Sequence, residues 1–173
     1  MMASPIIVRP ARIDEAEALG AIGFDAWCNS AFAEHDAGRA DRAALRAEFI
    51  AFCRQCHART LVAERAGVLL GWGARENDDF LISDLWVGAH AQGQGAGAAL
   101  LDALEVGIAK AGFDHVELET YAGNTGAVRF YHRHGYQTIW RGLKHSPSLN
   151  YALDKVRLAK TLAAQPDTGL PTA

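Results

Sequence analysis

The chain has 173 residues, of which 50% are hydrophobic, and its formal net charge at pH 7 is −3; this suits one α/β domain with a buried core. The mildly negative charge and the lack of a Lys/Arg cluster argue against a nucleic-acid partner. No apolar run is long enough to span a bilayer and the N-terminus lacks a basic-then-apolar signal pattern, so we expect a cytoplasmic protein with no membrane partner.

Hydrophobic periodicity and turn residues predict strands and helices in the following order. The expected strands are residues 6–9, 60–64, 68–75, 80–87, 116–121, 136–141 and 151–162, and the expected helices are residues 14–32, 41–57, 96–111 and 125–134. Asp14 and Glu17 match a capping box for the first helix, and Asp41 is positioned to cap the second. The polar, glycine-containing residues 34–40 are expected to form a loop, and Ala66-Gly67 is a hairpin signal between two strands.

The chain is predicted to fold as one domain over residues 1–162. Residues 163–173 contain two prolines and a glycine among few apolar residues, which predicts a disordered C-terminal tail. The sequence is compatible with a homodimer but does not choose between a dimer and a monomer.

Two cysteines stand in the pattern Cys53-Arg54-Gln55-Cys56-His57, which is formally the C-x-x-C-H signature of haem attachment. Covalent haem requires an exported protein, and a zinc site would need further ligands. Phe49, Phe52 and the two cysteines instead fit the buried face of a helix. We therefore expect a core role for this segment and no metal.

A glycine-rich segment, Gln92-Gly93-Gln94-Gly95-Ala96-Gly97, lies between the predicted strand 80–87 and the helix that starts at Ala96. Such a turn presents backbone N–H groups and the positive end of the helix dipole to one point, which favours a bound phosphate. No Gly-Lys-Ser/Thr follows, so a P-loop is excluded. The dinucleotide fingerprint is a more serious alternative, because the glycines fit G-x-G-x-x-G/A and Glu119 lies near the position of a ribose-binding acid. Against it, residues 88–92 separate the strand from the first glycine, and too few βα units follow.

The pattern Gln92-x-x-Gly95-x-Gly97 with its flanks resembles the Q/R-x-x-G-x-G/A motif of the GCN5-related N-acetyltransferases, the GNAT superfamily. Downstream, residues 124–136 (NTGAVRFYHRHGY) resemble that family's N-x-x-A-x-x-F-Y-x-x-x-G-F/Y segment. The resemblance is strong over residues 80–136 and depends on element order alone over residues 6–75. It implies a GNAT-like α/β (α+β) fold, with a central mixed, largely antiparallel sheet of about six to seven strands flanked by about four helices.

The resemblance further implies that acetyl-CoA is the acetyl donor and that the pantetheine arm pairs with the backbone of the strand before the glycine loop. The cofactor-binding residues implied in this way are Leu85, Trp86, Val87, Gln92, Gly93, Gln94, Gly95, Ala96, Gly97, Ala98 and Asn124. Asn124 also fits a helix N-cap, and a cap alone would explain it.

Two residues are candidates for moving protons. Tyr131 matches the family's tyrosine, and a phenol with a pKa near 10 can protonate a leaving thiolate; its alternative role is that of a core tyrosine. Asp84 lies where several family members have an acidic residue that acts as a base, directly or through water. Glu117, Glu119 and His90 are other candidates for the base, and an amine of lowered pKa would need none.

Acceptor recognition in this family falls mainly to the region between the first two helices and to the last strands. The candidates there are Trp27, Glu34 and Trp140, with Asn29, His35, Asp36, His145 and Tyr151 beside them. The resemblance implies an N-acetyltransferase acting on a primary amine of a small molecule or peptide. A non-catalytic coenzyme A sensor and a nicotinamide-dependent oxidoreductase are the alternatives.

Overall fold

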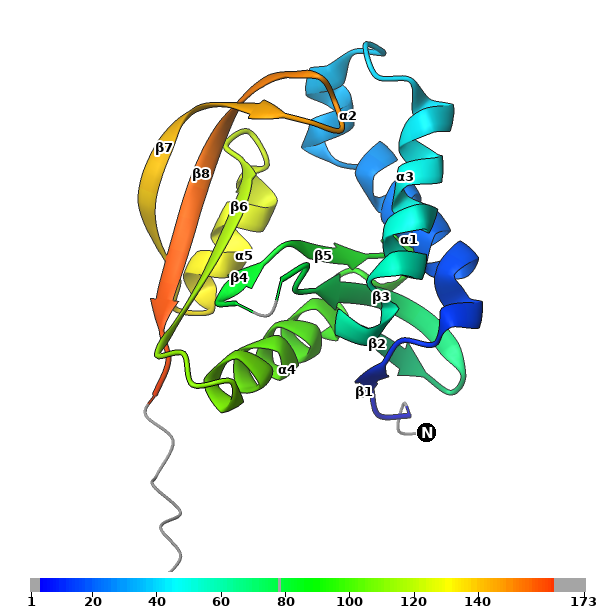
Figure 1. Ribbon diagram of the computed structural model, residues 1–173, viewed down its shortest axis with the longest axis vertical. Coiled ribbons are helices and arrows are strands. Elements are labelled where there is room, and N and C mark those ends of the chain that lie inside the picture. The colour runs from blue at the N-terminus through cyan, green and yellow to red at the C-terminus, as the bar shows by residue number, and fades with distance from the viewer. Residues whose placement is uncertain (1–3, 78, 164–173) are drawn as a thin grey trace, which may run out of the picture.

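The computed structural model describes residues 4–77 and 79–163 (Figure 1). Its strands are β1 (Ile7–Pro10), β2 (Thr60–Arg65), β3 (Val68–Ala74), β4 (Leu81–Ile82), β5 (Asp84–Val87), β6 (His115–Tyr121), β7 (Gln137–Ser146) and β8 (Tyr151–Thr161). Its α-helices are α1 (Ala16–Cys28), α2 (Ala31–Asp36), α3 (Arg42–Gln55), α4 (Ala96–Lys110) and α5 (Thr125–Arg133), with short 3-10 turns η1 (Ile13–Glu15), η2 (His57–Arg59) and η3 (Ala89–Ala91). The predicted tail lies outside the described residues apart from Ala163.

The described strands form two four-stranded sheets, in the orders β1-β2-β3-β5 and β4-β6-β8-β7. All neighbours are antiparallel except β4 and β6, which are parallel. The predicted single strand at 80–87 is therefore divided at Ser83: its first part pairs with β6 in one sheet and its second part with β3 in the other. The mixed, largely antiparallel α+β fold is confirmed, while the sheet is split into two halves that share this segment.

The helices at the N-terminus differ from the prediction in their boundaries. The chain leaves α1 at Cys28, and Ser30 caps a separate α2 by accepting a hydrogen bond from the Phe32 amide (3.2 Å). The capping box predicted at Asp14 is wrong, because Glu15 accepts the bond from the Arg12 amide (2.8 Å). The predicted cap at Asp41 is confirmed.

The first sheet is covered on both faces. Leu19 of α1 and Cys53 of α3 pack with Val62 and Trp72 on one face, and Trp72 is fully buried with its Nε1 donating to the Leu19 carbonyl (2.8 Å). On the other face α4 packs against β2 and β3. Cys53 thus lies in the core as predicted, and burial raises the pKa of its thiol to about 12.

The last two strands form a long hairpin that arches from the second sheet towards α2 (Figure 1). β7 continues to Ser146, beyond the predicted end at residue 141. At its tip the Tyr151 hydroxyl donates to the buried carboxylate of Asp36 (2.7 Å), and the Arg39 guanidinium lies 4.0 Å from the centre of the Tyr151 ring. This contact joins the hairpin to α2 and so closes one side of the space between the sheets. In the described part of the chain no helix is long and apolar enough to cross a membrane.

Candidate active site

The two sheets separate at the segment that they share. β6 pairs with Leu81 and Ile82 but, among the described strands, not with β5, so one edge of β5 is open. The Gly88 amide donates to the Leu70 carbonyl of β3 (2.9 Å). Since backbone groups alternate along an antiparallel strand, Trp86 also directs its amide to β3. The amides of Leu85 and Val87 therefore face the open edge, where an extended chain could pair with them.

The glycine loop leads from this open edge into α4. Gly93 and Gly95 have φ values of 72° and 93°, in the region that favours glycine, and Gly95 is the N-cap of α4 without a capping side chain. The first backbone hydrogen bond of α4 is donated by the Ala99 amide to the Gly95 carbonyl (3.0 Å). The amides of Ala96, Gly97 and Ala98 precede it, and such groups have no acceptor within a helix. The loop thus leads into a helix start with free amides as expected, while binding of an anion there stays a prediction.

An arginine that the sequence reasoning missed lies beside this loop. Arg65, at the end of β2, donates from Nη1 to the Gln94 side-chain oxygen (2.8 Å), across 29 positions of the chain. Its Nε is buried and has no hydrogen-bond partner among the described residues. A guanidinium here adds positive charge beside the loop that leads into α4. Only the β2–β3 hairpin brings it there, so no local pattern could have revealed it.

Helix α5 approaches the same loop from the second sheet. A Cβ built on Gly97 would lie 3.5 Å from both the Phe130 ring and the Val87 side chain, so this helix start is packed closely between β5 and α5. Asn124 caps α5 by accepting a hydrogen bond from the Ala127 amide (3.4 Å). The structure thus accounts for Asn124 as a cap, and its predicted contact to the cofactor stays a prediction.

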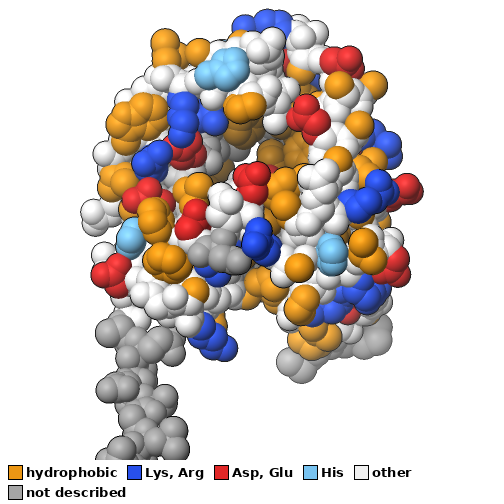
Figure 2. All heavy atoms as spheres, viewed as in Figure 1, with side chains coloured by type: hydrophobic (Ala, Val, Ile, Leu, Met, Phe, Trp, Pro, Cys, Tyr) orange, Lys and Arg blue, Asp and Glu red, His pale blue; other side chains and the backbone are white. Residues whose placement is uncertain are grey.

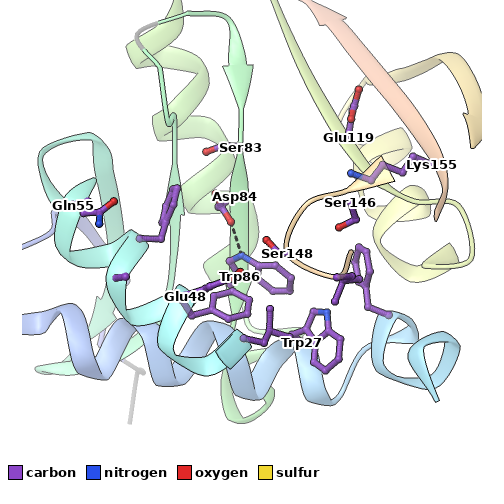
Figure 3. Close-up of a pocket in the computed structure, with 16 residues that line it drawn as sticks. Trp27, Glu48, Gln55, Ser83, Asp84, Trp86, Glu119, Ser146, Ser148 and Lys155 are labelled. Carbon is purple, nitrogen blue, oxygen red and sulfur yellow. Dashed lines mark hydrogen bonds between the residues drawn. The ribbon is translucent and has the colours of Figure 1, made fainter. Parts of the chain in front are cut away.

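A pocket of about 480 Å³ opens on the other side of β5, between α1 and α3 and the β6–β8 wall. Figure 2 shows the hollow, with hydrophobic side chains in its depth, and Figure 3 shows the residues around it. It is lined by Trp27, Phe32, Leu45, Glu48, Phe49, Ala51, Phe52, Gln55, Ser83, Asp84, Trp86, Glu119, Ser146, Ser148, Leu149 and Lys155.

Asp84 and Trp86 project from β5 into this pocket. The Trp86 indole Nε1 donates to Oδ1 of Asp84 (3.0 Å), as the dashed line in Figure 3 marks. Side chains alternate along a strand, so these two share one face, while Leu85 and Val87 pack on the opposite side near α4. Burial raises the pKa of Asp84, and the bond from Trp86 opposes this shift only in part. A carboxylate held in this way is a better proton acceptor than an exposed one.

Tyr131 lies in the core that joins α4, α5 and the second sheet. Tyr131 is 8% exposed, and its ring packs edge-on against the Tyr136 ring, with the ring centroids 5.7 Å apart. Burial, and secondarily the Asp84 carboxylate, raise the pKa of Tyr131. Its hydroxyl makes no hydrogen bond with any described side chain or backbone group, in contrast to Tyr136, which donates to Glu105 (2.9 Å). The phenol is therefore protonated at neutral pH and has no hydrogen-bond partner in the described part of the chain.

The other candidate residues are distributed unevenly around the pocket. Trp27, 3% exposed, is part of its wall, whereas Glu34 and Trp140 are exposed and do not line it. Glu119 lines it, but Lys144 (2.8 Å) and Arg157 (2.7 Å) already bind its carboxylate. Burial favours a higher pKa for Glu119, yet the hydrogen bonds from these two cations outweigh it and lower the pKa.

The remaining base candidates lie elsewhere. Glu117 is not part of the pocket wall and lies 3.7 Å from Arg157, and His90 is exposed near the Leu69 carbonyl (3.3 Å). The pocket residues that the sequence reasoning missed, above all Glu48, Gln55 and Lys155, come from α3 and β8. No three His, Cys, Asp or Glu side chains converge on a metal-sized site in the described ranges.

Known structures share this architecture. A GCN5-related N-acetyltransferase from Rhodopseudomonas palustris is similar at TM-score 0.74 and 23% identity, over 94% of this chain and 99% of that chain. YncA from Salmonella typhimurium, solved with acetyl-CoA, is similar at TM-score 0.65 and 21% identity, over 96% of this chain and 100% of that chain. The PaiA N-acetyltransferase from Thermoplasma acidophilum, solved with coenzyme A, is similar at TM-score 0.66 and 15% identity, over 91% of this chain and 99% of that chain. At these identities the likeness shows the fold.

The family of the protein is assigned from its sequence. No curated protein matches the chain. A sequence model described as the acetyltransferase (GNAT) family matches residues 24–136, more than half of the chain, and this span includes the glycine loop, Asp84 and Tyr131. The protein therefore belongs to the GNAT family of acetyltransferases.

Proposed function

We propose that this protein transfers an acetyl group from acetyl-CoA to a primary amine of a small molecule or peptide. The observation that carries this proposal is the open edge of β5, which has an anion-binding helix start at one end and a carboxylate-containing pocket on its far side. Membership of the acetyltransferase family supports acyl transfer, and two proteins of the same fold were solved with acetyl-CoA or coenzyme A.

The donor binds along the outside of β5. Its pyrophosphate is held by the amides of the loop formed by residues 92–98 and by the guanidinium of Arg65, because both present N–H donors to one region. The pantetheine arm extends along the open edge and pairs with the backbone of Leu85 and Val87 in the manner of an added strand. The thioester then reaches the gap between β5 and β6, beside the pocket.

The chemistry is attack of a neutral amine on the thioester carbonyl. The amine nitrogen forms the new C–N bond, the C–S bond breaks, and coenzyme A leaves as the thiol. Asp84 accepts the proton lost by the amine, directly or through water, which its raised pKa favours. Tyr131 donates to the sulfur as the C–S bond breaks, because its hydroxyl is protonated and has no other described partner. A backbone amide of the open edge faces the tetrahedral oxyanion.

Release of free thiol from acetyl-CoA, measured with a panel of amines, tests the transfer. Amino acids, polyamines, aminoglycosides and short peptides cover the acceptor classes, and thiol release that requires an acceptor is expected for at least one class. Thermal stability should rise with coenzyme A and stay unchanged with NAD or NADP. Coenzyme A binding without acceptor-dependent thiol release would favour the sensor alternative, and stabilisation by a nicotinamide dinucleotide alone would favour the oxidoreductase.

A further inference from the structure

One cation of the pocket wall makes neither a hydrogen bond nor an ion pair with the described residues. Lys155 lies on β8 and lines the pocket, yet its Nζ makes no hydrogen bond or ion pair with any described residue. The nearby carboxylate of Glu119 is already bound by Lys144 (2.8 Å) and by Arg157 (2.7 Å). Lys155 is half-buried, and burial lowers the pKa of its ammonium, while the charge of the Glu119 carboxylate opposes this shift only in part. A charged group that is removed from water without a partner is costly, so this site favours an anion that comes from outside the chain.

Much of the rest of the wall is aromatic. The Phe49 and Trp86 rings meet edge-on with centroids 5.2 Å apart, and Phe32 lies 6.4 Å from Trp86. Trp27 completes this surface from α1. Together these rings present a broad apolar surface beside Asp84, and such surfaces bind flat or bulky apolar groups.

The two charged groups come from opposite walls. Asp84 belongs to β5, beside the open edge, whereas Lys155 belongs to β8 across the pocket (Figure 3). A ligand that spans the pocket would therefore meet a carboxylate at one end and an ammonium at the other. A second positive charge on the acceptor, as in a polyamine, would be repelled if it approached Lys155.

We propose that the acceptor is a small amine that also carries a carboxylate and an aromatic or large aliphatic body. Its carboxylate pairs with Lys155, its body packs against Trp27, Phe49 and Trp86, and its amine lies towards Asp84. This inference rests on the proposed function, because it assigns the acceptor of that same site. The pocket volume of about 480 Å³ fits a ligand of amino-acid size, since small-molecule pockets span roughly 300–1,000 Å³.

Matched pairs of acceptors isolate the carboxylate. Phenylalanine is compared with 2-phenylethylamine, and tryptophan with tryptamine, by the kcat/KM for thiol release from acetyl-CoA. Because amine basicity differs within each pair, the informative quantity is the change in the acid-to-amine ratio between the wild type and a variant. Lys155→Met should lower this ratio by roughly ten- to a hundredfold, the span of one charge-assisted hydrogen bond. Lys155→Arg keeps a cation at this position and should retain most of the preference.

Lys110→Met, at the exposed end of α4, is the matched control and should leave the ratio unchanged. An equal ratio in the wild type and in Lys155→Met would overturn the inference while leaving acetyl transfer intact. Higher kcat/KM values for polyamines than for all four compounds would overturn it as well.

A binding measurement separates this inference from the proposed function. The dissociation constants of N-acetylphenylalanine and N-acetyl-2-phenylethylamine are measured by calorimetry on the wild type and on Lys155→Met, with and without coenzyme A. Tighter binding of the acid that is lost in Lys155→Met would support the anion site even if no thiol is released with any amine. Absence of thiol release would then count against acetyl transfer alone, and equal affinities for the two ligands would count against the anion site alone.

Discussion

The indole N–H of Trp86 donates to the carboxylate of Asp84 over 3.0 Å, between two side chains on one face of β5. One hydrogen bond thus connects the aromatic wall of the pocket to the residue that we propose as the base. It also moderates the proton affinity of that base, because burial raises the pKa of Asp84 and the indole opposes this effect in part. Both side chains project from the face of β5 that lines the pocket.

The first prediction concerns the acidic limb of the pH–rate profile. If Asp84 is the base, kcat/KM should rise with pH through a pKa above the ordinary aspartate value of 3.8, and Asp84→Asn should remove that limb and lower kcat/KM by roughly 10²–10⁴-fold. Trp86→Phe removes a bond that lowers this pKa, so the limb should move to higher pH. Initial rates from pH 4 to 9 with one acceptor give both results. An unchanged limb in Asp84→Asn would assign the base role elsewhere.

A second prediction separates catalysis from packing at Tyr131. Tyr131→Phe should lower kcat by roughly ten- to a thousandfold, because the leaving sulfur loses its proton donor, with little change in coenzyme A affinity. Tyr136→Phe is the matched control: it loses a buried bond to Glu105 (2.9 Å) and should lower stability by about 1–3 kcal/mol without a comparable loss of kcat. Steady-state kinetics and chemical denaturation of both variants give the comparison. Full turnover in Tyr131→Phe would make this tyrosine structural.

A third prediction uses two glycines with nearly the same backbone conformation. Gly95 and Gly112 have φ values of 93° and 94°, and a Cβ would find no contact closer than 3.8 Å at either position. Replacement by alanine should cost about 1–2 kcal/mol of stability at each. Coenzyme A affinity, measured by calorimetry, should fall roughly tenfold or more only in Gly95→Ala, since that strain displaces the amides at the start of α4. Equal affinities in the two variants would argue against phosphate binding by this loop.

The fourth prediction is a dependence of stability on pH. Arg9 donates to Glu15 (2.6 Å) and Glu64 (2.7 Å), and its hydrogen bond is the main reason that the pKa of Glu15 is lowered. The contribution of the ionised Glu15 to the stability of the fold is therefore present above pH 4.5, the ordinary glutamate pKa. It is lost as the pH falls through the lower pKa that Glu15 has in the folded state. Arg9→Met should cost about 1–3 kcal/mol near neutral pH and less under acidic conditions. Urea denaturation at several pH values measures this difference.

Arg54→Met provides the control for this effect. Arg54 lies 3.9 Å from Glu17, and both side chains are largely exposed. An exposed pair of this kind contributes about 0–1 kcal/mol, so the variant should unfold almost as the wild type does at every pH. A pH-independent loss in Arg9→Met would mean that Arg9 acts by packing rather than through its charge.

The elements around the proposed cofactor site could be predicted from the sequence because their signals are local. The glycine loop, the helix that starts at Ala96 and the capping residue Asn124 follow from short-range backbone chemistry. The hairpin turn at Ala66 and Gly67 belongs to the same class, and their φ values of 50° and 79° confirm it. The prediction of one helix over residues 14–32 failed at its C-terminal end. There the apolar pattern favoured a continuous helix, whereas Ser30 acts as the N-cap of a second short helix.

The pocket that we propose for the acceptor was decided by the tertiary structure alone. From the strand pattern alone, Asp84 could lie on either face of the sheet. Pairing of residues 84–87 with β3 fixes the face on which its side chain lies. The divergence of β5 from β6 leaves space for a pocket beside it. Glu34 and Trp140 were candidates for acceptor binding, but they lie outside the pocket. Lys155 lines the pocket because it belongs to the β7–β8 hairpin. The tip of this hairpin is joined to α2 by the hydrogen bond between Tyr151 and Asp36. Sequence patterns report neighbours along the chain, whereas this pocket is made by contacts between elements far apart in it.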